Sequence, residues 1–197
     1  MAKSAIIFFV CNPEPGKVKP AIASQMGETA AVDIYKKLLQ HTKTITQTIT
    51  GDVFVFCSEN NIVNDLWNEP PFFKRTQQGH DVASRLINAF ETVFARGYKK
   101  VAYVCTDCLD MDKKTLADAF KYLDQYDVVI GPSEEGRIYL LAVNSFTPAL
   151  FKNINWTHGL TQQLQKAAEL QQLSVRILPT LAEVETAEDC KKYPQLA

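Results

Sequence analysis

The feature that most constrains the fold is an apolar run that ends on an aspartate, VAYVCTDCLDMD at residues 101–112. Its first part, Val101–Cys105, is continuously apolar, which is typical of a strand buried on both faces of a sheet. Asp107 follows where that strand would leave the sheet. Because the carboxyl ends of strands border the ligand crevice of an open α/β sheet, Asp107 is a candidate site residue, with a solvated loop aspartate as the alternative. Asp110 and Asp112 are better placed to cap the helix that follows.

Predicted strands alternate with predicted helices along most of the 197 residues. The strands are expected at 5–10, 53–57, 101–105, 127–130, 138–143 and 174–178. The helices are expected at 28–47, from Asp81 as N-cap to Gly97, around 116–123, at 148–154 and at 160–172. Residues 58–76 give mixed signals, with a short helix at 62–67 as one option, and stay unassigned. This alternation predicts a single α/β domain with a mainly parallel, doubly wound sheet.

Composition argues against some classes of binding partner and suggests a cellular location. Lys and Arg number 21 against 22 Asp and Glu, so there is no basic excess to neutralise a nucleic-acid backbone, and nucleic acid is not an expected partner. No apolar stretch approaches the length of a membrane span. The apolar N-terminus is interpreted as a first strand rather than a signal peptide. An odd number of cysteines, five, without a secretory signal suggests reduced thiols and a cytoplasmic location.

A loop at the end of the first strand carries two lysines. Lys17 and Lys19 flank Val18, and Pro20 biases Lys19 toward an extended backbone, which would place both ammonium groups on one side. There they could meet phosphates. The alternative is a pair of solvated lysines on a surface loop.

Other motifs are set aside. Cys105 and Cys108 form a C-x-x-C, but the rest of a thioredoxin-type pattern is missing, so Cys105 is interpreted as a small core residue. The three histidines, which are scattered, complete no zinc site: His41, His80 and His158. The sequence has no Walker A loop, no G-x-G-x-x-G and no G-x-S-x-G. Four aromatic residues could form an acceptor platform but are more typical of a core: Trp67, Phe72, Phe73 and Trp156.

Several stretches together resemble one family. They are PEPGKVK at 13–19, QGHDVASRLINAFETVFARGYKKV at 78–101, TDCLDM at 106–111, DVVIGPSEEG at 127–136, ALFKNINW at 149–156 and EVETAEDC at 183–190. In order and spacing they are similar to the bacterial DUF2064 proteins, small glycosyltransferase-like proteins related to GT-A nucleotidyltransferases of the MobA and CofC kind. The resemblance covers residues 6–189. It implies a Rossmann-like three-layer α/β/α sandwich of the nucleotide-diphospho-sugar transferase type, with a mixed sheet of about seven strands. The nucleotide is expected in the half up to about residue 112 and the acceptor in residues 113–197.

The resemblance also implies roles for individual residues near the phosphates. Lys19 matches the lysine of the family's VKTRL loop, whose equivalent here also contains Gly16 and Lys17. Arg85 matches the arginine of a GGDLGER-like segment. These four are expected to bind the nucleotide.

The resemblance also implies roles for four acidic residues. Asp107 matches the metal-binding aspartate of GSDCPDL and, with Glu135 at the aspartate of DGGYYL, is expected to be catalytic. Glu183 and Glu185 match the DVD pair and are expected, with Asp107, to bind Mg²⁺ or Mn²⁺. Such a metal takes oxygen ligands and bridges diphosphate oxygens.

The departures from the family pattern bear on the site. KTRL becomes Lys19-Pro20-Ala21-Ile22, and a further family lysine is replaced by Cys11, which together remove three phosphate-directed groups. A glycine of DGGYYL becomes Arg137, which could compensate for the missing charge or block the pocket. Both aspartates of DVD are glutamates.

The leading hypothesis is a metal-assisted glycosyltransferase-like protein that uses a nucleotide-sugar and a small acceptor. One alternative is a nucleotidyltransferase that uses CTP or GTP on a small phosphorylated molecule. The other is a catalytically degenerate member with a binding or assembly role. The sequence leaves the oligomeric state open.

Overall fold

One mixed sheet organises the chain in the computed structural model, which describes residues 3–47, 49–59, 66–156 and 159–196. Its seven described strands run in the order β3-β2-β1-β4-β6-β5-β7. Their bounds are Ser4–Val10 (β1), Asp52–Cys57 (β2), Phe72–Thr76 (β3), Lys100–Val104 (β4), Val128–Pro132 (β5), Ile138–Val143 (β6) and Val175–Ile177 (β7). Strand β6 is antiparallel to its neighbours β4 and β5, and all other pairs are parallel. The predicted fold class is therefore confirmed.

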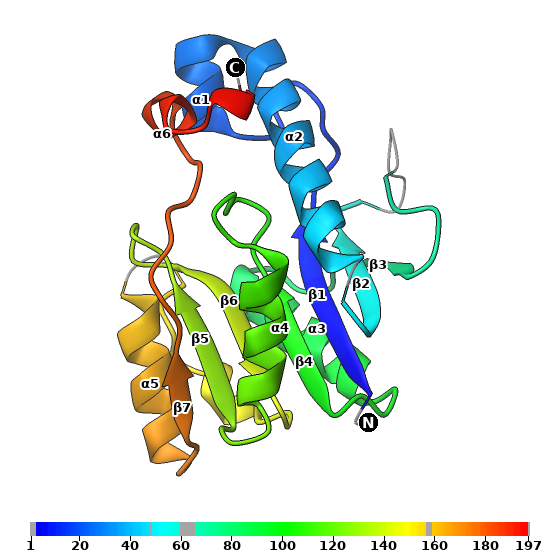
Figure 1. Cartoon of the computed structure of the whole chain (residues 1–197), viewed down its shortest axis with the longest axis vertical. Helices are drawn as coiled ribbons and strands as arrows, with labels where there is room; N and C mark the ends of the chain where they lie inside the picture. The colour runs from blue at the N-terminus through cyan, green and yellow to red at the C-terminus, as the bar shows by residue number, and fades with distance from the viewer. Residues whose placement is uncertain (1–2, 48, 60–65, 157–158, 197) are drawn as a thin grey trace.

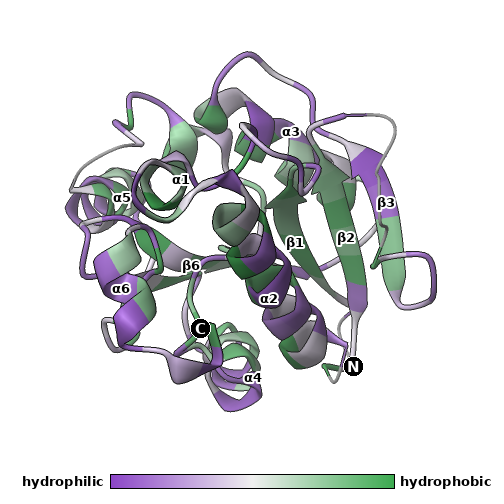
Figure 2. Cartoon of the chain, turned by 90° about the horizontal axis from the view of Figure 1, so that it is seen from above, coloured by the Kyte–Doolittle hydropathy of each residue, from purple (hydrophilic) through white to green (hydrophobic). Residues whose placement is uncertain are grey.

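Helices cover both faces of the sheet because side chains alternate along each strand. In β1, Ile6 and Phe8 belong to the cluster that packs against α2 (Glu28–Thr46) and α4 (Lys113–Tyr122). Their neighbour Ile7 belongs to the cluster on the opposite face, which contains residues of α3 (Val82–Phe94) and α5 (Leu160–Leu170). Figure 2 shows β1 and β2 as hydrophobic strands beside helices of mixed character. Burial on both faces explains why the central strands have continuous apolar runs.

A smaller helical cap lies beyond the carboxyl end of β1 (Figure 1). It consists of α1 (Pro20–Met26), the first part of α2, α6 (Ala187–Lys191) and the 3-10 helix η2 (Pro194–Leu196). Apolar residues from both ends of the chain, including Ile22, Leu38 and Val184, form its own cluster. This cluster holds the C-terminal segment beside the N-terminal loop.

Local predictions have mixed outcomes. Asp81 and Asp112 cap α3 and α4 as expected, each accepting a hydrogen bond 2.7 Å long from a backbone N–H of the first turn. Residues 148–154 are not an α-helix: only the 3-10 helix η1 (Pro148–Phe151) forms there. Helix α1 and strand β3 were not predicted. The helix considered at 62–67 falls largely outside the described residues.

The four singled-out aromatic residues do not share one environment. Trp67 and Phe72 are buried, as predicted for a core, and Trp156 is half-buried. Phe73 is 42% exposed, so the core prediction is wrong for it. Among the described helices, none has both the length and the apolar character needed to cross a bilayer.

Gly131→Ala tests the packing between β5 and β6. A Cβ at Gly131 would lie 2.4 Å from the Tyr139 ring, closer than van der Waals contact allows. We expect the free energy of unfolding to fall by about 1–3 kcal/mol in urea titrations, because the added methyl overpacks the core. In a double variant with Tyr139→Leu the two losses should not add, since the smaller side chain removes the clash. Strict additivity would contradict this packing.

Candidate functional site

A cavity of about 300 Å³ opens at the carboxyl ends of β1 and β4. After β1 the chain crosses to β2 on one side of it, whereas after β4 the chain crosses in the opposite direction along the sheet, to β5. Such a change of direction between neighbouring parallel strands is where α/β sheets bind ligands. The lining residues come from the end of β1, the loop after it, α2, the end of β4 and the C-terminal segment: Phe9, Cys11, Lys17, Val18, Lys19, Pro20, Tyr35, Tyr103, Cys105, Thr106, Asp107 and Glu185.

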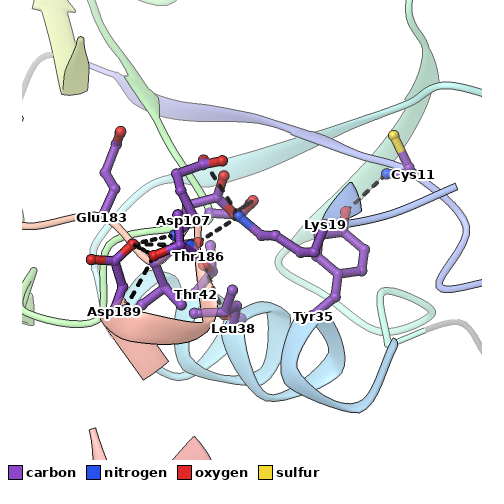
Figure 3. A network of polar contacts seen from close by, with 12 residues as sticks. Cys11, Lys19, Tyr35, Leu38, Thr42, Asp107, Glu183, Thr186 and Asp189 are labelled. Atoms are coloured by element: carbon purple, nitrogen blue, oxygen red, sulfur yellow. Dashed lines mark hydrogen bonds and ion pairs between the residues drawn. The ribbon is translucent and has the colours of Figure 1, made fainter. Parts of the chain in front are cut away.

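Lys19 is the central cation of this site (Figure 3). Its ammonium lies 2.8 Å from Asp107 Oδ1 and 3.5 Å from Glu185 Oε1, and it donates a 2.8 Å hydrogen bond to the carbonyl of Val184. The side chain is only 6% exposed. Burial alone would lower the pKa of Lys19, but the charges of Asp107 and Glu185 outweigh it and raise the pKa above its ordinary value. Lys19 is therefore a buried ammonium ion.

The expected extended backbone at Lys19 is wrong. Lys19 has φ 47° and ψ 57°, in the left-handed region, immediately before Pro20 at the start of α1. Lys17 lines the same cavity, but it is exposed and pairs with Glu14 at 2.8 Å and Glu59 at 2.7 Å. Gly16 forms the turn before it with φ +75° and is not a lining residue. The two lysines thus have different environments.

Asp107 ties the sheet to the C-terminal segment. Its carbonyl accepts a 2.8 Å hydrogen bond from the backbone N–H of Val184, whose own carbonyl is the acceptor for Lys19. Its carboxylate, 20% exposed, also accepts a weak hydrogen bond, 3.4 Å long, from the Thr106 hydroxyl. The structure thus brings Asp107, Lys19 and Glu185 together.

Arg137 joins the other two acidic positions. Its Nε donates to Glu183 Oε2 at 2.8 Å, and its Nη2 lies 2.7 Å from the same oxygen and 2.9 Å from Glu185 Oε1. The Glu183 side chain is 1% exposed. Burial raises the pKa of Glu183 and of Glu185, whereas the neighbouring cations Arg137 and Lys19 oppose that rise. Arg137 does not line the cavity, so it does not block it.

Two predicted residues lie at the margin. Glu135 is exposed, and its carboxylate accepts a 3.5 Å hydrogen bond from the Glu183 backbone N–H. Arg85 lies at the start of α3, where its guanidinium donates to the Gly79 carbonyl at 3.1 Å and to the Gln77 side chain at 3.3 Å. Neither lines the cavity. Their predicted roles stay predictions.

The acidic residues do not fit a metal ion as they are arranged. In the described part of the chain, no group of three or more His, Cys, Asp or Glu side chains is placed to hold one. The oxygens of Asp107, Glu183 and Glu185 that would coordinate it contact Lys19 and Arg137 instead. The Mg²⁺ or Mn²⁺ site therefore stays a prediction from the resemblance, without ready-made geometry.

The C-x-x-C cysteines are not activated thiols. None of the five cysteines forms a disulfide. Burial raises the pKa of Cys105 well above its ordinary value and that of Cys108 to about 12, so neither is a thiolate at neutral pH. Both observations argue against a redox pair. Cys108 is buried, whereas Cys105 is half-buried and lines the cavity, so the prediction of a core residue is wrong for Cys105.

The sequence reasoning missed three aromatic residues of the cavity wall and a helix cap beside it. Phe9 and Tyr103 line the cavity with ring centroids 5.5 Å apart, and Tyr35 accepts a 3.0 Å hydrogen bond from the Cys11 backbone N–H. A capping box between Thr186 and Asp189 starts α6, and Asp189 also accepts from the Glu185 backbone N–H. The T-x-x-D spacing at 186–189 could have revealed this last contact.

Comparisons with known proteins identify the family and the fold. A family model described as "Uncharacterized protein conserved in bacteria (DUF2064)" matches residues 41–158. The crystal structure of a candidate nucleotide-diphospho-sugar transferase from Desulfovibrio desulfuricans G20 is similar with a TM-score of 0.89 and 29% identity, over 99% of this chain and 88% of that one. No curated protein matches the sequence.

Two more distant structures show the fold alone. One is CMP:2-keto-3-deoxy-manno-octonic acid synthetase complexed with CTP, with a TM-score of 0.56 and 10% identity over 99% of this chain and 98% of that one. The other is a Mycobacterium tuberculosis H37Rv protein in complex with manganese, with a TM-score of 0.56 and 11% identity over 99% of both chains. The chain therefore has the fold shared by nucleotide-diphospho-sugar transferases and nucleotidyltransferases.

Lys19→Met tests the buried ion pair. Without the ammonium, the already raised pKa of Glu185 should rise further, and charging this carboxyl should cost the folded state more. A raised carboxyl pKa stabilises the fold at low pH and loses that effect as pH rises. The deficit should therefore be small near about pH 4 and reach about 3 kcal/mol near about pH 8.

Urea titrations at both pH values measure this deficit. Lys17→Met, which removes an exposed lysine from the same loop, is the matched control and should show a much smaller pH-dependent deficit, because its ion pairs with Glu14 and Glu59 are exposed to solvent. Equal deficits at the two pH values would contradict the ion-pair interpretation.

Proposed function

Because the chain belongs to the DUF2064 family, we propose that it binds a nucleotide-sugar between β1 and β4 and transfers the glycosyl group to a small acceptor. The observation that carries this proposal is the position of the cavity. It lies at the point where the connections of the sheet diverge, and its lining combines two lysines, an aspartate, a glutamate and three aromatic residues.

The lining offers complementary groups to each part of such a donor. Lys17 and Lys19 line the cavity and would offer positive charge to a diphosphate in exchange for their present carboxylate partners. The rings of Phe9 and Tyr103, which pack edge to face, give an aromatic wall for a base or sugar. Asp107, at the cavity floor, is a hydrogen-bond acceptor for a sugar or acceptor hydroxyl.

The remaining predicted residues have smaller roles in the proposal. Glu135 is exposed and borders the Glu183 backbone, so it is available as a second carboxylate for an acceptor hydroxyl. Gly16 shapes the turn that presents Lys17, and Arg85 would serve only a ligand long enough to reach the start of α3. The predicted Mg²⁺ or Mn²⁺ is no step of this proposal, since its candidate ligands are already paired.

Nucleotidyl transfer from CTP or GTP is the second candidate. It is supported by the similarity of nearly the whole chain to a synthetase that was solved with CTP. Both reactions need a nucleotide in the same cavity, and they differ in the donor. A catalytically degenerate binding protein would keep the nucleotide and lack turnover.

Thermal unfolding with a panel of UDP-hexoses, CTP and GTP tests the proposal. A donor at a hundred times its Kd adds about 2.7 kcal/mol of stability, or roughly 5–10 °C in Tm for a chain of this size. We expect such a shift with one class of donor and product formation with a suitable acceptor. No shift with any nucleotide at millimolar concentration would overturn the proposal.

Asp107→Asn and Lys19→Met should each reduce the ligand-induced shift, because both residues line the cavity. Each shift is referred to the variant's own unliganded Tm. Lys114→Met removes a lysine that is exposed on α4, outside the cavity, and should keep the full shift. An unchanged shift in both cavity variants would place the nucleotide elsewhere.

A further inference from the structure

We propose that the guanidinium of Arg137 takes the place of a divalent cation between Glu183 and Glu185, while Lys19 pairs with Asp107, so that this chain binds its nucleotide without a metal ion. The nucleotide part rests on the proposed function. The absence of metal affinity in the carboxylate cluster is independent of it.

The contacts of Arg137 are those of a bridging cation. Nη2 is buried between Glu183 and Glu185, within 2.9 Å of an oxygen of each. No contact of Nη2 meets hydrogen-bond geometry, so its position is set by charge rather than by a directed bond, whereas Nε makes the directed bond to Glu183. A cation placed between two carboxylates holds them together by charge, as a metal ion would.

The backbone fixes where this guanidinium can reach. In the turn between β5 and β6, Ser133 donates its N–H to the Arg137 carbonyl at 2.9 Å, and the Arg137 N–H donates to the Ser133 hydroxyl at 3.1 Å. Ser133 is itself buried. Both backbone groups of Arg137 are therefore held, and the side chain extends toward the C-terminal segment from a fixed base.

The charges around this point are nearly balanced before any ion arrives. Asp107, Glu183 and Glu185 carry three negative charges, and Lys19 and Arg137 carry two positive ones. A divalent ion would have to approach oxygens to about 2.0–2.1 Å in octahedral geometry, which the guanidinium prevents while it contacts both glutamates. Metal binding therefore requires that Arg137 leave, which would strip the buried Glu183 of its partner.

The cavity keeps its own cations for the nucleotide. Lys17 and Lys19 line it, whereas Arg137 lies outside the lining and contacts it only through Glu185. Arg137 thus neutralises Glu183 and Glu185 from outside the cavity. This reduces the negative charge of Glu185 that acts on Lys19, whereas Lys17 keeps its own partners Glu14 and Glu59.

The first test titrates Mn²⁺ against the wild-type chain, Arg137→Ala, Arg137→Lys and Arg176→Ala, with the electron paramagnetic resonance signal of free Mn²⁺ as readout. Arg176 is on β7, and its guanidinium lies over the ring of Tyr122. It is the matched control for loss of an arginine. We expect no saturable binding to the wild type, Arg137→Lys or Arg176→Ala. Arg137→Ala should bind Mn²⁺ with an affinity at least about tenfold higher than the wild type, because the substitution removes a positive charge beside the ion.

Saturable Mn²⁺ binding by the wild type that Glu183→Gln abolishes would overturn the inference, and so would an Arg137→Ala variant that folds and gains no affinity. If Arg137→Ala does not fold alone, refolding in Mn²⁺ should recover its circular dichroism spectrum, and failure to do so counts against the inference.

The second test repeats the thermal shifts with EDTA and with Mn²⁺, using whichever nucleotide raises the Tm most. Equal shifts under both conditions support metal-independent binding, and a shift that EDTA abolishes overturns it. If no nucleotide shifts the Tm under either condition, the proposed function fails while the Mn²⁺ titration still decides the role of Arg137.

Discussion

The buried ammonium of Lys19 is the interaction on which the site depends. It joins three parts of the chain that are far apart in sequence: the loop after β1, the end of β4 through Asp107 and the C-terminal segment through Val184 and Glu185. Removing such a charge from water is costly unless its partners are close and well directed, and here three oxygens surround it. The apolar cluster of the cap keeps these partners in place, since Val184 belongs to it. The cap and the ion pair therefore stabilise each other.

This long-range contact explains the unusual backbone of Lys19. A left-handed conformation costs a residue with a side chain roughly 1–2 kcal/mol, and the following proline adds its own restriction. The Lys19 side chain nevertheless reaches a carbonyl 165 residues away in sequence. Local preference, which predicted an extended Lys19, is outweighed by contacts that only the folded chain provides.

The same distinction separates what the sequence predicts from what it does not. The apolar runs of β1, β2, β4 and β6 and the periodicity of the four long helices predicted the sandwich, because burial on the sheet follows from local pattern. Strand β3, FFKRT, lies at the sheet edge and has no clear alternation, and α1 starts at a proline after the misjudged Lys19. Asp107 was identified because strand ends are predictable. Lys19 was singled out from its place in the loop after the first strand, but its pairing with Asp107 was not predicted. The pairing of Arg137 with Glu183, 46 residues apart, likewise depends on tertiary geometry.

That pairing makes the departures from the family pattern intelligible as one coupled change. A guanidinium contacts carboxylate oxygens at 2.7–2.9 Å here, farther than the roughly 2.0–2.1 Å of a magnesium ion, and it enters from the β5–β6 turn rather than from solvent. The side chains of Glu183 and Glu185, one methylene longer than aspartate, reach the guanidinium of Arg137. Arginine at 137 without these glutamates would be a cation without partners, and the glutamates without Arg137 would be two carboxylates crowding Asp107. Arg137, Glu183 and Glu185 therefore depend on one another for their charge partners, and a singly charged guanidinium stands where a divalent ion would carry two charges.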